Sequence, residues 1–125
     1  MKYYLTIILI ILGFNSFPLF PTNINFIDVC VKGICFSSRV MDNPITRAKG
    51  LMNETFLPAN EGMLFVFPMN VTPEFWTKKM HYPIDIMFIN DDDIVVYLVK
   101  NAPPCKTDEC QIFKPTTPVS RVLEI

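Results

Sequence analysis

Short apolar runs separated by turn residues fill most of the chain, and they predict strands rather than long helices. Two of these runs, residues 24–31 and 34–37, flank a Lys32-Gly33 turn. A two-residue turn pairs Cys30 with Cys35 and sorts the apolar side chains onto one face of a hairpin. A slip of one residue would mix the two faces, so the pattern favours this register.

The rest of the chain continues the same pattern, with one interruption. Strands are predicted over residues 63–67, from residue 75 onwards, over 84–89 and 94–99 as a hairpin, and over 120–125. One short helix is expected near residues 44–52, because Asn43 can cap its start and Pro44 suits its first turn. These elements predict a mainly β (α+β) domain: a small, mostly antiparallel curled sheet or half-open barrel with one short helix.

The N-terminal segment differs from this pattern. Lys2 precedes an unbroken apolar run over residues 3–14, which has the charge and length of a secretory signal and is short for a membrane span of roughly 20 residues. We therefore expect residues 1–20 to be a signal peptide or an N-terminal anchor. As an anchor, residues 3–20 would attach the protein to the membrane. This predicts an exported protein that is periplasmic, extracellular or anchored to the outer face of the cytoplasmic membrane, with a single domain over residues 24–125.

Composition narrows the classes of function. The 125 residues include 11 Lys and Arg and 12 Asp and Glu, so the formal net charge of −1 indicates no nucleic-acid partner. The sequence contains no phosphate-binding glycine loop, dinucleotide fingerprint or zinc-protease motif. We expect no cofactor and no metal ligand set.

Four cysteines occur as two pairs with the same spacing. An even number of cysteines in an exported chain indicates disulfides, and we expect Cys30–Cys35 across the hairpin and Cys105–Cys110 within a loop. Crossed pairing, free thiols and a four-cysteine zinc site are the alternatives. Structural zinc usually has tighter spacing in at least one pair, which makes zinc the weakest of these.

A candidate binding site centres on Asp85, whose strand face is otherwise apolar. A carboxylate in such surroundings has a raised pKa or a cationic partner, which Lys78 or Arg47 would supply. Trp76 would add a stacking surface for a sugar or a base. We therefore predict a binding site of Trp76, Lys78, Asp85 and Arg47, against the simpler interpretation of a structural ion pair beside core aromatics.

This site favours a non-catalytic module that binds a small ligand or an envelope protein. The alternative is a small hydrolase-type enzyme that uses Asp85 with Lys78 or Glu61. His81 is the only histidine, and no serine or cysteine nucleophile motif accompanies it. The balance of these observations is against an enzyme.

Several motifs follow one another along the chain: RAKGLM at residues 47–52, EGMLFVF at 61–67, FW-x-K at 75–78, P-x-DI-x-FI at 83–89 and RVLEI at 121–125. Together they resemble DUF192, an exported bacterial and archaeal family of unknown function. The resemblance covers residues 28–125 and implies a compact, mainly β domain with minor helix.

Two departures from that family accompany the resemblance. After Phe-Trp the family usually continues Met-Lys-Asn-Thr, whereas this chain reads Thr-Lys-Lys-Met at residues 77–80. Family members also usually continue beyond the last strand, with a closing strand. The second departure indicates either a domain truncated at its C-terminus or one whose last sheet edge is open.

Overall fold

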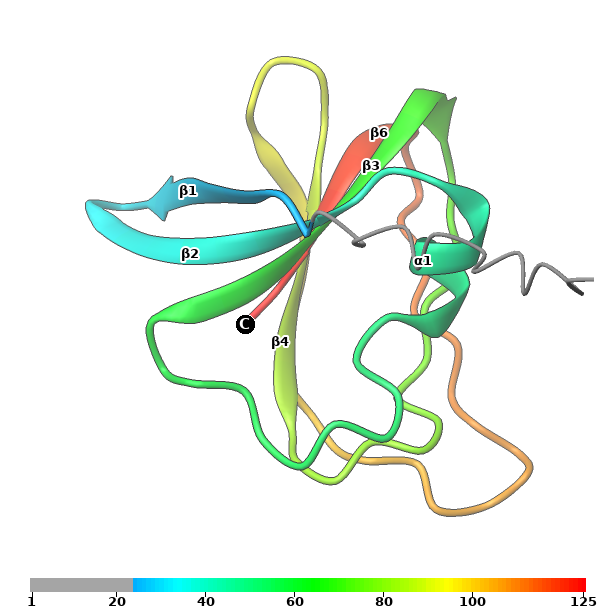
Figure 1. Cartoon of the computed structure of the whole chain (residues 1–125). Helices are drawn as coiled ribbons and strands as arrows, with labels where there is room; N and C mark the ends of the chain where they lie inside the picture. Colours follow the sequence, from blue (N-terminus) through cyan, green and yellow to red (C-terminus); the bar gives the residue numbers. More distant parts are fainter. Residues whose placement is uncertain (1–23) are drawn as a thin grey trace, which may run out of the picture.

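A computed structural model describes residues 24–125, and the predicted leader lies outside these residues. The strands are Phe26–Val31 (β1), Ile34–Met41 (β2), Glu61–Val71 (β3), Ile84–Ile89 (β4), Val95–Ala102 (β5) and Val119–Glu124 (β6), with a helix at Pro44–Lys49 (α1). They form one twisted sheet in the order β1-β2-β3-β6-β4-β5 (Figure 1). The predicted mainly β fold with one short helix is confirmed, and the sheet is not closed into a barrel.

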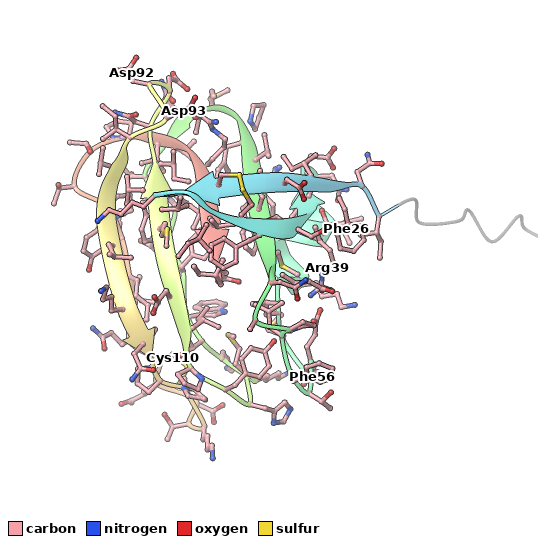
Figure 2. All side chains as sticks on the ribbon, turned by 90° about the vertical axis from the view of Figure 1, so that its left-hand side faces the viewer. Phe26, Arg39, Phe56, Asp92, Asp93 and Cys110 are labelled. Atoms are coloured by element: carbon pink, nitrogen blue, oxygen red, sulfur yellow. A yellow bond between two sulfur atoms is a disulfide. The ribbon has the colours of Figure 1, made fainter. Side chains whose placement is uncertain are left out.

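The β1–β2 hairpin has the predicted register. Cys30 lies opposite Cys35, and the two turn residues Lys32 and Gly33 both have positive φ, as a tight hairpin turn requires. The disulfide between the two strands is visible in Figure 2. β2 continues beyond the predicted end at Ser37, and its second half pairs with β3 in parallel. All other strand pairs are antiparallel.

β6 lies inside the sheet and not at its edge. Leu123 pairs with Leu64 of β3 on one side and with Met87 of β4 on the other. The expectation of an open edge at the last strand is therefore wrong, and the edges of the described sheet are β1 and β5. Because neighbours cover β6 on both sides, its last three residues are all buried.

Apolar side chains pack on both faces of the sheet. The larger cluster includes Phe65, Phe88 and Val122, and it extends into the loops through residues such as Leu51 and Phe113. The smaller cluster lies on the opposite face because alternate strand residues point to opposite sides. It consists of Leu64, Met87, Ile89 and Leu123, covered by Val29 and Val31 of the curled hairpin.

The helix α1 is fixed at both ends by local interactions. The Asn43 side chain accepts hydrogen bonds from the backbone N–H groups of Ile45 and Thr46, at 3.1 and 3.0 Å. The helix ends at Gly50, earlier than predicted, where φ is +47°. A Cβ at this position would also lie 3.3 Å from Cζ of Phe65, so only glycine lets the helix end pack on that ring.

The strand predicted from residue 75 is present only as two isolated bridges, Phe75 with Phe113 and Lys78 with Cys105. Phe75 and Phe113 exchange two backbone hydrogen bonds of 2.9 Å each. The buried hydroxyl of Thr77 donates to the carbonyl of Pro103 at 2.6 Å. The partner of this segment is an irregular, proline-containing loop rather than a strand, and so no continuous ladder can form.

No helix within residues 24–125 has the length and apolar character needed to cross a membrane.

Candidate ligand pocket

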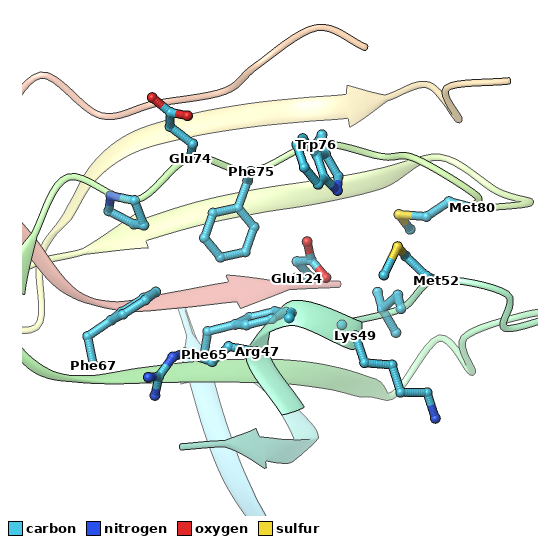
Figure 3. A pocket seen from close by; sticks show the side chains of 14 residues that line it. Arg47, Lys49, Met52, Phe65, Phe67, Glu74, Phe75, Trp76, Met80 and Glu124 are labelled. Carbon is cyan, nitrogen blue, oxygen red and sulfur yellow. The ribbon is translucent and has the colours of Figure 1, made fainter. Parts of the chain in front are cut away.

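A cavity of about 250 Å³ lies between the end of α1, the middle of β3 and the segment that carries Phe75 and Trp76. The Phe65 and Phe75 rings meet edge to face, with their centroids 4.9 Å apart. Trp76 is half exposed at the mouth. Figure 3 shows the sulfur atoms of two lining methionines at the end of the pocket away from Phe67. Four aromatic side chains and two methionines therefore contribute to the wall, as is typical of small-molecule sites.

The acidic side chain of Glu124 projects into this cavity from β6, between Phe75 and Trp76 on one side and Phe65 on the other (Figure 3). The residue is only 3% exposed, and its Oε2 has no hydrogen-bond partner among the described residues. Burial raises the pKa of the Glu124 carboxyl from 4.5 to about 8, with a smaller contribution from the charge of Glu54. At neutral pH the free pocket therefore holds a protonated carboxyl.

Two basic residues of α1 line the same cavity, but neither pairs with Glu124. The Arg47 guanidinium donates to the carbonyl of Val66 at 2.9 Å and lies 5.2 Å from the centre of the Phe67 ring. The Lys49 side chain points away from the cavity in Figure 3. Within residues 24–125, Glu124 takes part in no ion pair.

Glu54, whose negative charge contributes to the raised pKa of Glu124, forms an ion pair with Arg39. The two side chains form a double hydrogen bond of 2.7 and 2.6 Å and are both mostly buried. This hydrogen bond is the largest cause of a raised pKa at Arg39. Arg39 is thus committed to Glu54, which leaves Glu124 as a separate carboxyl without a counterion.

The structure separates the residues of the predicted binding site. Trp76 and Arg47 line the Glu124 pocket. The Lys78 ammonium lies on the surface, 3.7 Å from an oxygen of the fully exposed Asp108. Asp85 lies in a different hollow, so the expected cluster of Asp85, Lys78 and Trp76 is not formed. Binding roles for Lys78 and Asp85 stay predictions.

That second hollow, of about 280 Å³, brings Asp85 together with Glu61 and Tyr82. The Asp85 carboxylate accepts a hydrogen bond of 2.7 Å from the backbone N–H of Asn101, a residue with positive φ. Desolvation is the main cause of a raised pKa at Tyr82. Two of the residues named for a hydrolase, Asp85 and Glu61, therefore line the same hollow, whereas Lys78 lines neither this hollow nor the Glu124 pocket.

The cysteines lie in the two pairs expected from their spacing. Cys30 and Cys35 join β1 to β2, and Cys105 and Cys110 close the loop that holds the Phe75 segment. No cysteine of residues 24–125 is free. In the same residues, no three His, Cys, Asp or Glu side chains gather as a metal site would need. The second disulfide therefore restrains the loop that supports one wall of the pocket.

Glu124 was not among the residues selected from the sequence, although a signal for it exists. It follows Val122 by two positions in a strand, so both side chains point to the same face. In VLEI the carboxyl is flanked by apolar residues, as in a strand that is covered on both faces. A lone acidic residue in such a strand is a candidate for a raised pKa.

Comparison with known proteins gives a family and a fold without a function. Residues 27–125 match the model of DUF192, which is described as uncharacterised. A protein of unknown function from Novosphingobium aromaticivorans DSM 12444 is 29% identical, with a TM-score of 0.72 over 84% of this chain and 76% of that one. A protein from Sinorhizobium meliloti 1021, provisionally described as a transcription regulator, is 28% identical, with a TM-score of 0.67 over 73% and 68% of the two chains. No curated protein matches the chain.

Proposed function

The chain belongs to the DUF192 family, and we propose that it is a non-catalytic module that binds a small ligand in the Glu124 pocket. The observation that carries this proposal is the Glu124 carboxyl, which is buried, points into a cavity with aromatic rings in its wall, and has no partner for its Oε2 within residues 24–125. Buried polar groups in folded proteins are nearly always hydrogen-bonded. A ligand with a matching polar group would satisfy this one.

The size of the pocket supports a small occupant. Drug-sized ligands usually occupy pockets of roughly 300–1,000 Å³. The Glu124 cavity, of about 250 Å³, lies just below that range. It suits a molecule with the bulk of an amino acid, a single sugar ring or a small amine, with Trp76 at the mouth to cover it.

Acid–base catalysis is the second candidate, because the pKa of Glu124 near 8 is suited to proton transfer at neutral pH. The second carboxyl of the lining, Glu74, is paired with Lys114 at 3.1 Å, and the described lining holds no Ser, Thr, Cys, His or Asp to act as a nucleophile. Binding therefore explains the pocket with fewer missing parts. The alternative pairing of Asp85 with Glu61 has the two residues in one hollow, at a distance from the aromatic pocket.

Trp76 provides a direct test, because it is the only tryptophan of the chain and lies at the pocket mouth. The purified full-length chain, with both disulfides formed, is titrated with choline, glucose and acetate while tryptophan emission is recorded. We expect saturable changes with at least one of these probes. Saturable binding by none of them at millimolar concentration would overturn the proposed function.

A pair of matched variants then locates the site. Trp76→Leu removes a half-exposed aromatic ring from the pocket, and Phe56→Leu removes an exposed ring that lies outside it. Calorimetry should show at least tenfold weaker binding for Trp76→Leu, as is common when an aromatic binding residue is truncated. Phe56→Leu should bind like the wild type, and equal losses in both variants would place the ligand elsewhere.

We also propose that the protein works outside the cytoplasm. The apolar segment after Lys2 has the pattern of a secretory signal, and disulfides persist in oxidising compartments. Fractionation of cells that express the full chain, with thiol labelling before and after reduction, tests this. Protein found in the cytoplasm with four reactive thiols would contradict it.

A further inference from the structure

We infer that the Glu124 pocket receives an organic cation, whose positive charge lies between the Glu124 carboxylate and the aromatic wall formed by Phe65, Phe75 and Trp76. This inference rests on the proposed function and names the chemical class of its ligand. A quaternary or primary ammonium group on a small aliphatic body fits the description. The argument follows from what the cavity offers and from what it lacks.

The first step is the missing counterion. Among the described residues no lysine, arginine or histidine forms an ion pair with Glu124, and its Oε2 accepts no hydrogen bond. Burying a carboxylate without a partner costs several kcal/mol, which is why the free site keeps its proton. A positively charged ligand would supply the partner and allow the proton to leave.

The second step is the chemistry of the walls. Aromatic rings carry negative charge on their faces, and cations within about 6 Å of a ring centre are attracted to it. Figure 3 shows Phe75 and Trp76 on one side of Glu124 and Phe65 on the other. The thioethers of Met52 and Met80 add polarisable surface without adding a hydrogen-bond donor. A carboxylate and several aromatic rings in one small cavity together favour positive charge.

The third step concerns the basic residues of the pocket. Arg47 is occupied by the carbonyl of Val66 and by the Phe67 ring, so it does not fill the site beside Glu124. Its contact with Phe67 is itself a cation resting on an aromatic wall of this cavity. Lys49 extends away from the carboxyl (Figure 3). An anionic ligand would find no free positive group directed at the position that Glu124 occupies.

The test compares choline with its neutral isostere 3,3-dimethyl-1-butanol, which has the same shape without the charge. Binding to the full-length chain is measured by tryptophan emission and calorimetry between about pH 6 and pH 9. We expect choline to bind at least tenfold more tightly than the isostere. As the pH increases from about 6 to about 8, the affinity for choline should rise by up to about tenfold per pH unit, because choline binds the ionised carboxyl. Above about pH 8 the affinity should level off.

Two variants make the result specific to Glu124. Glu124→Gln keeps the shape of the side chain, removes its charge, and should lower the affinity for choline to that of the isostere and abolish the pH dependence. Glu109→Gln makes the same chemical change at an exposed position outside the pocket and should leave both unchanged. Binding of choline that is equally strong in Glu124→Gln would overturn the inference.

The outcomes separate the inference from the proposed function. Equal affinity for choline and the isostere, or binding of glucose or acetate alone, would overturn the organic cation and leave the pocket as a ligand site. Failure of every probe would overturn both. If Glu124→Gln did not fold, Trp76→Phe would serve instead, because Phe keeps an aromatic ring that attracts cations less strongly than Trp does. This variant should lose more affinity for choline than for the isostere.

Discussion

Glu124 and Asp85 are two carboxyl groups at almost the same place in the sheet, yet their surroundings differ completely. Glu124 pairs with Ile86, the residue after Asp85, and the backbone of Asp85 exchanges two hydrogen bonds with that of Ile125. The two side chains point to opposite faces. Asp85 accepts a backbone N–H at the edge of an open hollow, whereas Glu124 lies among aromatic rings without a partner. The face of the strand, and not the residue type, sets the chemistry of each group.

The largest expected effect of this difference is a pH dependence of stability that belongs to Glu124. The pKa of the Glu124 carboxyl rises from its ordinary value of 4.5, which applies to the unfolded chain, to about 8 in the folded protein. The folded protein therefore binds this proton more tightly than the unfolded chain. The resulting stabilisation is complete below pH 4.5 and is lost as the pH rises through about 8. Its full size is on the order of 5 kcal/mol. Urea unfolding of the wild type and of Glu124→Gln at several pH values measures it.

Glu124→Gln should unfold with a nearly flat pH profile and be the more stable protein above about pH 8. Asp85→Asn should keep the slope of the wild type, because the other carboxyl is untouched. A wild type and a Glu124→Gln variant with parallel profiles would show that the buried carboxyl ionises normally. The contrast between the two faces would then fail.

An intermediate effect is expected from Asp85→Ala. This change removes the acceptor of the Asn101 N–H, which fixes a residue with positive φ at the end of β5. The free energy of unfolding should fall by about 1 kcal/mol, the usual contribution of one hydrogen bond. Asp85→Asn retains an oxygen acceptor and should recover most of that loss in the same urea measurement. Equal losses in the two variants would mean that the hydrogen bond does not matter.

The smallest effect is expected from Glu54→Gln, which changes the surroundings of Glu124 without touching the pocket. Removal of one negative charge should lower the pKa of Glu124, since the charge of Glu54 contributes to raising it. Carbon-13 NMR titration of the Glu124 carboxyl gives the change directly. Glu109→Gln, at an exposed site, serves as the control. An unchanged or higher pKa would show that Arg39 already neutralises Glu54 as far as Glu124 is concerned.

Local interactions explain which parts of the fold could be predicted from the sequence. The register of the first hairpin depends on the two turn residues and on alternation within a few positions, and it was correct. The start of α1 depends on Asn43 and the next three residues, and it was also correct. The end of α1 was placed too late because Gly50 stops the helix against Phe65, which is distant in sequence.

The candidate site could be predicted only in part, because it is assembled from distant segments. Arg47 and Trp76 were selected for their chemistry, and the structure brings them to one pocket. Lys78 was expected to join them in a strand that is present only as isolated bridges. The buried position of Glu124 depends on the insertion of β6 between β3 and β4. The apolar neighbours of Glu124 in VLEI indicate a covered strand, but they do not indicate which strands or side chains cover it.

The central place of β6 has a consequence for the order of folding. Within the sheet, β6 alone connects the β1-β2-β3 half to the β4-β5 half, and it is the last strand of the described chain. Until residues 119–124 are available, each half has an unpaired inner edge and an uncovered apolar face. The sheet of residues 24–125 therefore cannot be completed before residues 119–124 have been synthesised.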